Sequence, residues 1–329
     1  MLVQYKSVFT SILVLAQTLH TSVQAFGIEA RNASWQVNLT PNTVNQIEYF
    51  TRHGYGVIVP DMLGYGGTDS PEDLESYRLK SIASEMVELL DCEGVDKAVT
   101  VGHDFGAAIL TTLQVYSPDR LLALAYVTVG YTAPGGDFTL ADVEALNNQT
   151  NALLGYPVFG YFIFHNTERA VPAFDDHLDS VFTLWFTNNA TYHREHVAPL
   201  GALEQWLSED RKAPYGGIWI TDVVKEQWKT IVMAQGGFAG GLRWYKAIMG
   251  GVNQPDLPAL QNVSKIITAP TFVLTANLDP VFPPSVTLNN TLPWAPRAWP
   301  RTLDSGHFVQ MERADALNAE LHDFLKSLQ

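Results

Sequence analysis

The chain has one cysteine, Cys92, so a disulfide within the chain is excluded and the fold must be stable without one. It has no run of about 20 apolar residues, the length that a membrane-spanning helix needs. Lysine and arginine form no cluster, and a net charge of −14 repels phosphate groups. We therefore expect no nucleic-acid partner and no stable membrane insertion. Because Gly/Ser linkers and repeats are also lacking, the 329 residues favour one domain with an insertion.

The first 25 residues have the pattern of a secretion signal, which we predict to be cleaved after Ala25. Lys6 supplies the positive start, residues 8–19 are largely apolar, and Val23 and Ala25 mark the cleavage site. A buried N-terminal helix is the alternative for this stretch. Candidate glycosylation sites of the Asn-x-Ser/Thr type support secretion, and they are Asn32, Asn38, Asn148, Asn189, Asn262 and Asn289.

The most informative stretch is a strand, a sharp turn and a helix around Asp104. The apolar residues 98–101 stop at Gly102, and a helix of small residues begins at Gly106. This is the pattern of a nucleophile elbow, in which glycines let the strand and the helix approach closely. Asp104 occupies the place of the nucleophile. The alternative is that Asp104 only caps the helix, since aspartate is a good N-cap residue.

Strands and helices alternate on both sides of this turn, as in a parallel sheet with crossover helices. The expected strands are residues 55–60, 98–101, 121–129, 267–275 and 297–303, and the expected helices are residues 47–54, 81–91, 106–116 and 314–328. Between residues 131 and 251 the alternation stops, and aromatic residues at helical spacing take its place. We therefore predict a core of residues 26–130 and 252–329, with a helical cap of residues 131–251 inserted in it.

Two further polar residues follow strands of the predicted sheet. Asp279 comes after residues 267–275, and His307 comes after residues 297–303. Ligands of open α/β sheets bind beyond the carboxyl ends of the strands, so these two side chains can meet Asp104. The order nucleophile, acid, histidine is that of the α/β-hydrolase fold. Each residue alone can also be an ordinary turn or loop residue.

From about residue 46 onward the chain resembles the α/β-hydrolase-type epoxide hydrolases. The resemblance rests on Pro60-Asp-Met-Leu-Gly-Tyr-Gly-Gly-Thr-Asp69, Gly102-His-Asp-Phe-Gly106, Asp279 and Gly306-His307. Haloalkane and fluoroacetate dehalogenases share these features. Two cap segments, Pro157-Val-Phe-Gly-Tyr161 and Leu242-Arg-Trp-Tyr245, are similar to those that carry the ring-opening tyrosines of epoxide hydrolases.

The resemblance implies an epoxide hydrolase that forms a vicinal diol from a small apolar epoxide and water, without a cofactor or a metal. Asp104 would attack carbon and form an alkyl ester, while Tyr161 and Tyr245 would donate protons to the epoxide oxygen. His307, oriented by Asp279, would activate the water that hydrolyses the ester. The backbone N–H of Phe105 would be one oxyanion donor.

Two other functions stay open at this point. A haloalkane-type dehalogenase needs N–H donors for the halide, and Trp185, Trp206 and Trp219 of the cap are candidates. Phe105 weakens this interpretation, because the compared dehalogenases usually carry Trp or Arg after the nucleophile. The other alternative is a degenerate protein that binds the substrate without turnover. His193 and His196 have no metalloprotease spacing, and we expect them on a solvated helix.

The chain departs from the family in lacking the His-Gly-x-Pro loop that supplies the second oxyanion donor. His53-Gly54 precedes a strand instead of following one, and the residues before it are too few for the usual leading strands. We therefore expect a sheet without these leading edge strands. A wrong first exon, a degenerate enzyme or a substitute donor from residues 26–46 would each explain the departure. With a wrong exon, the signal would be an artefact and the protein cytoplasmic.

Overall fold

A six-stranded sheet forms the centre of the computed structural model, which describes residues 10–16, 27–30, 33–36, 44–136, 138–216 and 219–329. In spatial order the strands are β4 (Gly56–Ile58), β1 (Thr10–Ala16), β5 (Ala98–Asp104), β6 (Leu121–Val127), β7 (Thr271–Ala276) and β8 (Ala298–Leu303). The strands β5 to β8 are parallel, whereas β1 is antiparallel to both of its neighbours. The prediction of an α/β-hydrolase fold with a mostly parallel sheet is confirmed.

Helices cover both faces of the sheet, and the alternation of side chains along β6 explains why. Leu124 and Tyr126 face the helices α2 (Leu79–Cys92) and α3 (Gly106–Tyr116). Ala123, Ala125 and Val127 face the opposite side, where α15 (Ala314–Lys326) and α1 (Val44–Arg52) pack. A strand that is apolar on both faces is the expected pattern for a parallel sheet covered by helices.

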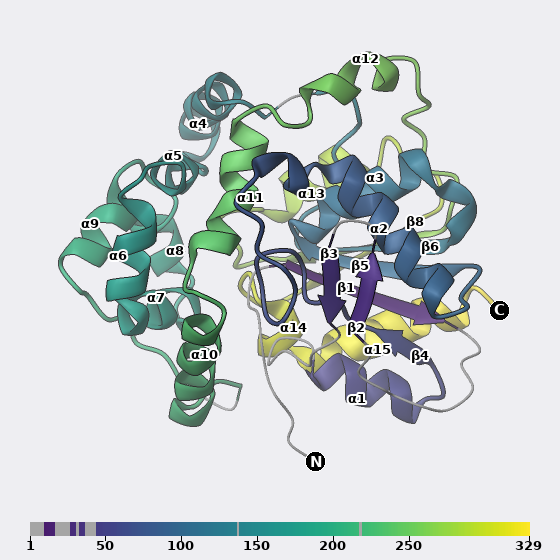
Figure 1. Ribbon diagram of the computed structural model, residues 1–329, viewed down its shortest axis with the longest axis horizontal. Coiled ribbons are helices and arrows are strands. Elements are labelled where there is room, and N and C mark those ends of the chain that lie inside the picture. The colour runs from purple at the N-terminus through teal and green to yellow at the C-terminus, as the bar shows by residue number, and fades with distance from the viewer. Residues whose placement is uncertain (1–9, 17–26, 31–32, 37–43, 137, 217–218) are drawn as a thin grey trace.

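The insertion between β6 and β7 consists of helices and has an aromatic core of its own. Its helices are α4 (Leu140–Leu154), α5 (Gly160–His165), α6 (Ala170–Asp176), α7 (Leu178–Trp185), α8 (Thr191–His196), α9 (Ala202–Ser208), α10 (Asp222–Ala234) and α11 (Ala239–Met249). Figure 1 shows α4 to α10 gathered on one side of the molecule, with α11 between them and the sheet. These helices fall inside the predicted cap, residues 131–251.

Short elements complete the connections. They are η1 (Leu74–Tyr77), η2 (Pro118–Arg120), η3 (Gln254–Asp256), α12 (Leu257–Leu260), α13 (Pro284–Thr291) and α14 (Val309–Glu312). None of the described helices is long and apolar enough to cross a membrane.

The N-terminal residues contribute strands that the sequence does not predict. Residues 10–16 belong to the apolar part of the predicted secretion signal, and they form β1, paired with β5 from Thr10 opposite Asp104 to Leu15 opposite Val99. The alternative of a helix is therefore wrong for this segment. A chain cut after Ala25 would lack β1. A hairpin of β2 (Gly27–Ala30) and β3 (Ala33–Gln36) follows in a stretch without an alternating pattern.

Candidate active site

Asp104 lies at the end of β5 in a tight turn that requires glycine at position 102. Its backbone has φ of +53°, a left-handed conformation that costs a non-glycine residue about 1 kcal/mol or more. A Cβ at Gly102 would lie 2.6 Å from the carbonyl carbon and oxygen of Gly106, so glycine is required there. The helix α3 then begins at Gly106. The predicted strand, sharp turn and helix are therefore present, and Asp104 is not the N-cap residue of α3, which is Phe105.

The three predicted polar residues meet beyond the carboxyl ends of β5, β7 and β8. His307 Nδ1 lies 2.7 Å from Asp279 Oδ2, and His307 Nε2 lies 3.3 Å from Asp104 Oδ2. The Asp279 side chain is fully buried, and those of His307 and Asp104 are 12% and 17% exposed. The other Asp279 oxygen accepts hydrogen bonds from the backbone N–H groups of Val281 and Phe282. Asp279 is therefore fixed in place and holds the imidazole by its Nδ1 atom.

The two carboxylates control the charge of His307. Burial alone would lower the pKa of the imidazole, but the charge of Asp279 and the hydrogen bonds to Asp104 and Asp279 raise that pKa to about 10. Burial would likewise raise the pKa of both carboxyls, yet the interactions with His307 outweigh it and lower them. At neutral pH the resting site therefore contains two carboxylates and one imidazolium.

The two oxygens of Asp104 have different partners. Oδ1 accepts a hydrogen bond of 2.8 Å from the backbone N–H of Phe105, whereas Oδ2 faces His307. An N–H group in this place can stabilise a negative charge that develops on Oδ1. In the part of the chain that the structure describes, no second backbone N–H donates to Asp104.

Tyr161 on α5 and Tyr245 on α11 lie together in the cap, above Asp104. Their rings are 6.1 Å apart between centroids, and Tyr245 packs edge to face on Phe105, the residue after Asp104, at 4.9 Å. Both side chains are buried. Burial is the main reason why the pKa values of both phenols are raised well above the usual range. The negative charge of Asp104 raises the pKa of Tyr161 further, and the neighbouring phenol raises that of Tyr245 further. Both phenols therefore keep their protons at neutral pH.

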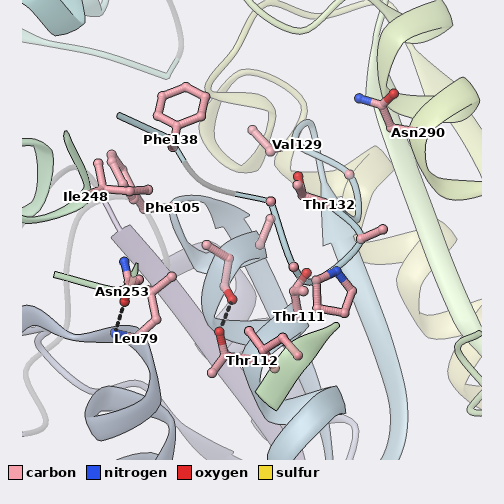
Figure 2. A pocket seen from close by; sticks show the side chains of 18 of the residues that line it. Leu79, Phe105, Thr111, Thr112, Val129, Thr132, Phe138, Ile248, Asn253 and Asn290 are labelled. Carbon is pink, nitrogen blue, oxygen red and sulfur yellow. Dashed lines mark hydrogen bonds between the residues drawn. The ribbon is translucent and has the colours of Figure 1, made fainter. Parts of the chain in front are cut away.

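A cavity of about 450 Å³ begins at Asp104 and is lined mostly by apolar side chains. Near Asp104 its walls are Phe105, Tyr161 and Phe162, and from there it follows one face of α3 through Ala108, Thr112 and Tyr116. Figure 2 shows Phe105 beside Ile248, and Thr111 and Thr112 along the helix wall. At the other end the wall includes the polar side chains of Lys80, Asn253 and Asp256.

Three residues near the site, Ala108, Thr112 and His103, were not predicted from the sequence. Ala108 and Thr112 follow Asp104 at intervals of four residues, so their small size on one helix face was a readable signal for a channel. The imidazole of His103 lies 4.7 Å from that of His307, and its Nε2 is 2.9 Å from the His307 carbonyl oxygen. Because a carbonyl can only accept, His103 carries its proton on Nε2.

One minor expectation about the cap is wrong. His193 does not lie on a solvated face but is buried, with Nε2 3.0 Å from the Leu184 carbonyl and 3.1 Å from the Trp185 carbonyl. It lies against the C-terminal end of α7 and the ring of Phe308, and a helix of only six residues gave too little periodicity to predict this.

The candidate halide donors of the cap lie apart from the cavity. None of Trp185, Trp206 and Trp219 belongs to its described lining. The indole N–H of Trp206 instead donates to the Ser180 carbonyl at 3.4 Å. Among the residues that the structure describes, no group of three or more His, Cys, Asp or Glu could hold a metal ion.

The comparisons with known proteins agree with this fold. Residues 38–158 match the family described as the alpha/beta hydrolase fold. The rat bifunctional epoxide hydrolase 2 is 24% identical over 288 residues, which are 86% of this chain and 49% of that protein. Epoxide hydrolase 1 of Siraitia grosvenorii is 27% identical over 301 residues, which are 86% of each chain. The chain thus spans about half the length of its bifunctional relatives.

Among solved structures, epoxide hydrolase A from Mycobacterium thermoresistibile superposes with a TM-score of 0.72 at 23% identity. The match covers 93% of this chain and 99% of the other. At that identity the superposition shows the fold and not the activity. The sheet, the turn at Asp104 and these similarities identify the chain as an α/β-hydrolase-fold protein that is similar to epoxide hydrolases.

Proposed function

We propose that the protein hydrolyses apolar epoxides to vicinal diols through a covalent ester on Asp104. One observation carries the proposal: an ionised carboxylate and a protonated phenol, those of Asp104 and Tyr161, line one end of an apolar cavity, and a second protonated phenol, Tyr245, packs on Tyr161 and Phe105. A carboxylate can attack carbon without a base, and phenols can protonate an alkoxide. The names of the similar proteins support the same reaction.

The first step in this proposal moves one negative charge across the site. Oδ2 of Asp104 attacks an epoxide carbon, the C–O bond breaks, and its electron pair stays on the epoxide oxygen. Tyr161 or Tyr245 gives that oxygen a proton and becomes a phenolate. Before the attack, burial and, in addition, the charge of Asp104 favour the protonated form of both phenols, and after the attack the contribution of Asp104 is gone.

The same step prepares His307 for the second half of the reaction. Esterification removes the charge of Asp104, one of the groups that raise the His307 pKa, so the imidazole becomes easier to deprotonate. The imidazolium first releases its proton to solvent. The neutral His307 then takes a proton from water, which attacks Cγ while Oδ1 draws charge toward the Phe105 N–H. The Cγ–Oδ2 bond breaks and the imidazolium protonates the leaving oxygen. The proton of the new carboxyl restores the phenol, and His307 takes up a proton from solvent, which returns the site to its resting state.

Replacing both phenols tests the assignment of the proton donors. The variant Tyr161→Phe plus Tyr245→Phe is expected to lower the rate of diol formation by about 10³-fold or more, because the epoxide oxygen then leaves as an unprotonated alkoxide. Diol formed from an apolar epoxide is measured by chromatography. Tyr192→Phe, a cap tyrosine that packs on His196 and Trp206, serves as the control. A double variant as fast as the control would contradict the assignment.

The substrate is expected to have an apolar arm that lies along α3. Ala108→Phe places a ring in the channel one turn from Asp104, so KM for a long-armed epoxide is expected to rise about tenfold. A short epoxide, which does not reach Ala108, is expected to keep its KM. Steady-state kinetics are measured for both epoxides with the same variant, so the short epoxide serves as the control for the long-armed one. Equal effects on both substrates would argue against this placement.

Hydrolytic dehalogenation is the second candidate, and the site favours it less. A halide leaves without a proton and needs N–H donors, but the cavity wall near Asp104 offers the phenol of Tyr161 and the ring of Phe105 in their place. Assaying the chain with a haloalkane and an epoxide of similar size tests both reactions. Halide release without diol formation would select dehalogenation, and a stable ester without product would select the degenerate binding protein.

Secretion is a further proposal that rests on the sequence. Asn148, Asn189, Asn262 and Asn289 are exposed, as glycosylation requires, and Asn32 and Asn38 lie outside the described residues. The cleavage site at Ala25 also lies outside them. The N-terminal residue of the mature protein distinguishes a cleaved, secreted chain from a cytoplasmic one that retains β1.

A further inference from the structure

His165 is a buried histidine without a hydrogen-bond partner. It ends α5 and is 2% exposed, and neither Nδ1 nor Nε2 has a partner among the described residues. His193, the other fully buried histidine of the cap, has two backbone carbonyls beside its Nε2. Burying an unpaired polar group costs free energy that phenylalanine at the same position would not. The chain therefore has an imidazole at a position where an apolar ring would avoid the cost of two unpaired nitrogens.

The neighbours of His165 are the two phenols of the candidate site. Its ring lies 4.3 Å from that of Tyr245 at 82° and 5.3 Å from that of Tyr161 at 73°. Tyr161 lies four residues earlier on α5, which places it on the same helix face. Phe174 of α6 closes another side at 5.2 Å. Of the rings that contact both phenols, Phe162 is apolar, whereas His165 carries an N–H dipole.

We propose that His165 is a positioning residue whose unpaired N–H stabilises the negative charge that ring opening places on the Tyr161–Tyr245 pair. The inference rests on the proposed epoxide hydrolysis. Burial lowers the pKa of His165 to about 3, so the imidazole is neutral and acts as a dipole, not as a cation. Among the described residues, the titratable groups whose rings contact His165 are the two phenols.

The proposed role depends on where the negative charge lies after the first step. When the epoxide C–O bond breaks, a phenol O–H bond also breaks, and its proton goes to the epoxide oxygen. The electron pair of the O–H bond stays in the buried phenolate until ester hydrolysis returns a proton. An aromatic ring attracts a nearby N–H dipole weakly, and it does so more strongly when it is anionic. The imidazole thus has little to bind in the resting protein and a charge to stabilise during the reaction.

The variant His165→Phe tests this role, because it keeps a planar ring and removes the dipole. We expect the Tm to rise by about 2 °C, since an unpaired polar group has gone from the core. The rate of ester formation on Asp104 is expected to fall about tenfold or more. It is measured by mixing the protein with an apolar epoxide, quenching the reaction rapidly and determining the ester by mass spectrometry. The alkaline limb of its pH profile should move to higher pH, because the phenols become harder to ionise.

Two further variants separate this role from packing. His165→Gln keeps an N–H donor and is expected to recover part of the rate of ester formation. His193→Phe removes the imidazole that lies within hydrogen-bond distance of the Leu184 and Trp185 carbonyls. It should therefore lower the Tm and leave the rate of ester formation unchanged.

The outcomes distinguish the two proposals. Wild-type protein that forms no ester would overturn the proposed function and, with it, the role of His165. Wild-type protein that forms the ester, together with a His165→Phe variant of equal rate and pH profile, would overturn the role of His165 alone. Equal slowing by Phe and Gln would also overturn it, since the N–H would then be irrelevant.

Discussion

Replacing Asp104 with alanine is expected to lower epoxide turnover by about 10⁴-fold or more, because no other carboxylate of the described cavity lining lies near His307. Alanine is the better choice than asparagine, since a side-chain amide beside an activated water can hydrolyse back to aspartate. Diol formation measures turnover, and the mass of the intact protein should show no adduct.

The control for this variant is Asp119→Ala, which removes an exposed carboxylate in η2 that is not part of the described cavity lining. We expect it to retain full activity. An Asp104→Ala protein that is folded and forms diol at the control's rate would remove the covalent mechanism, whatever the other variants show.

The variant His307→Gln is expected to separate the two halves of the reaction. Asp104 is ionised without help, so attack on the epoxide should continue, whereas the ester should persist because water lacks its base. Turnover is expected to fall by about 10³-fold. Intact-protein mass spectrometry should show one equivalent of epoxide added, located on the peptide that contains Asp104.

The two tyrosine substitutions provide the matched comparison for His307→Gln. Without the phenols, neither ester nor diol should form at an appreciable rate. The double tyrosine variant and His307→Gln are therefore expected to be equally slow in turnover, but only His307→Gln should carry the epoxide adduct. A His307→Gln protein that carries no adduct would contradict the assignment of His307 to the second step. An adduct on another residue would contradict the assignment of Asp104.

The fold and the core of the site were readable from the sequence because each depends on a local pattern. The two glycines Gly102 and Gly106 indicate a tight turn, in which a Cβ at position 102 would clash with the backbone. Asp104, Asp279 and His307 each follow an apolar strand. Parallel strands bring such residues to one edge of the sheet whatever the details of packing. The two cap tyrosines were predicted from the resemblance to epoxide hydrolases and not from their spacing in the sequence.

Other features were out of reach because they depend on contacts between distant segments. The burial of His193 comes from α7, and the isolation of His165 from partners comes from the packing of α5 against α6 and α11. The high pKa of His307 arises from two carboxylates that are 28 and 203 positions away in the chain. In β1, an apolar segment has the same composition as a secretion signal, so periodicity alone does not distinguish them.

The central claim is that Asp104 itself becomes the ester, and oxygen exchange tests it most directly. The wild-type protein is mixed with an apolar epoxide in water enriched in heavy oxygen, and the peptide containing Asp104 is then analysed by mass spectrometry. The mechanism predicts unlabelled diol in the first turnover, because its second oxygen comes from Asp104, and heavy oxygen in the Asp104 carboxylate afterwards. Heavy oxygen in the first-turnover diol and none in Asp104 would mean that water attacks the epoxide directly, which would contradict the account.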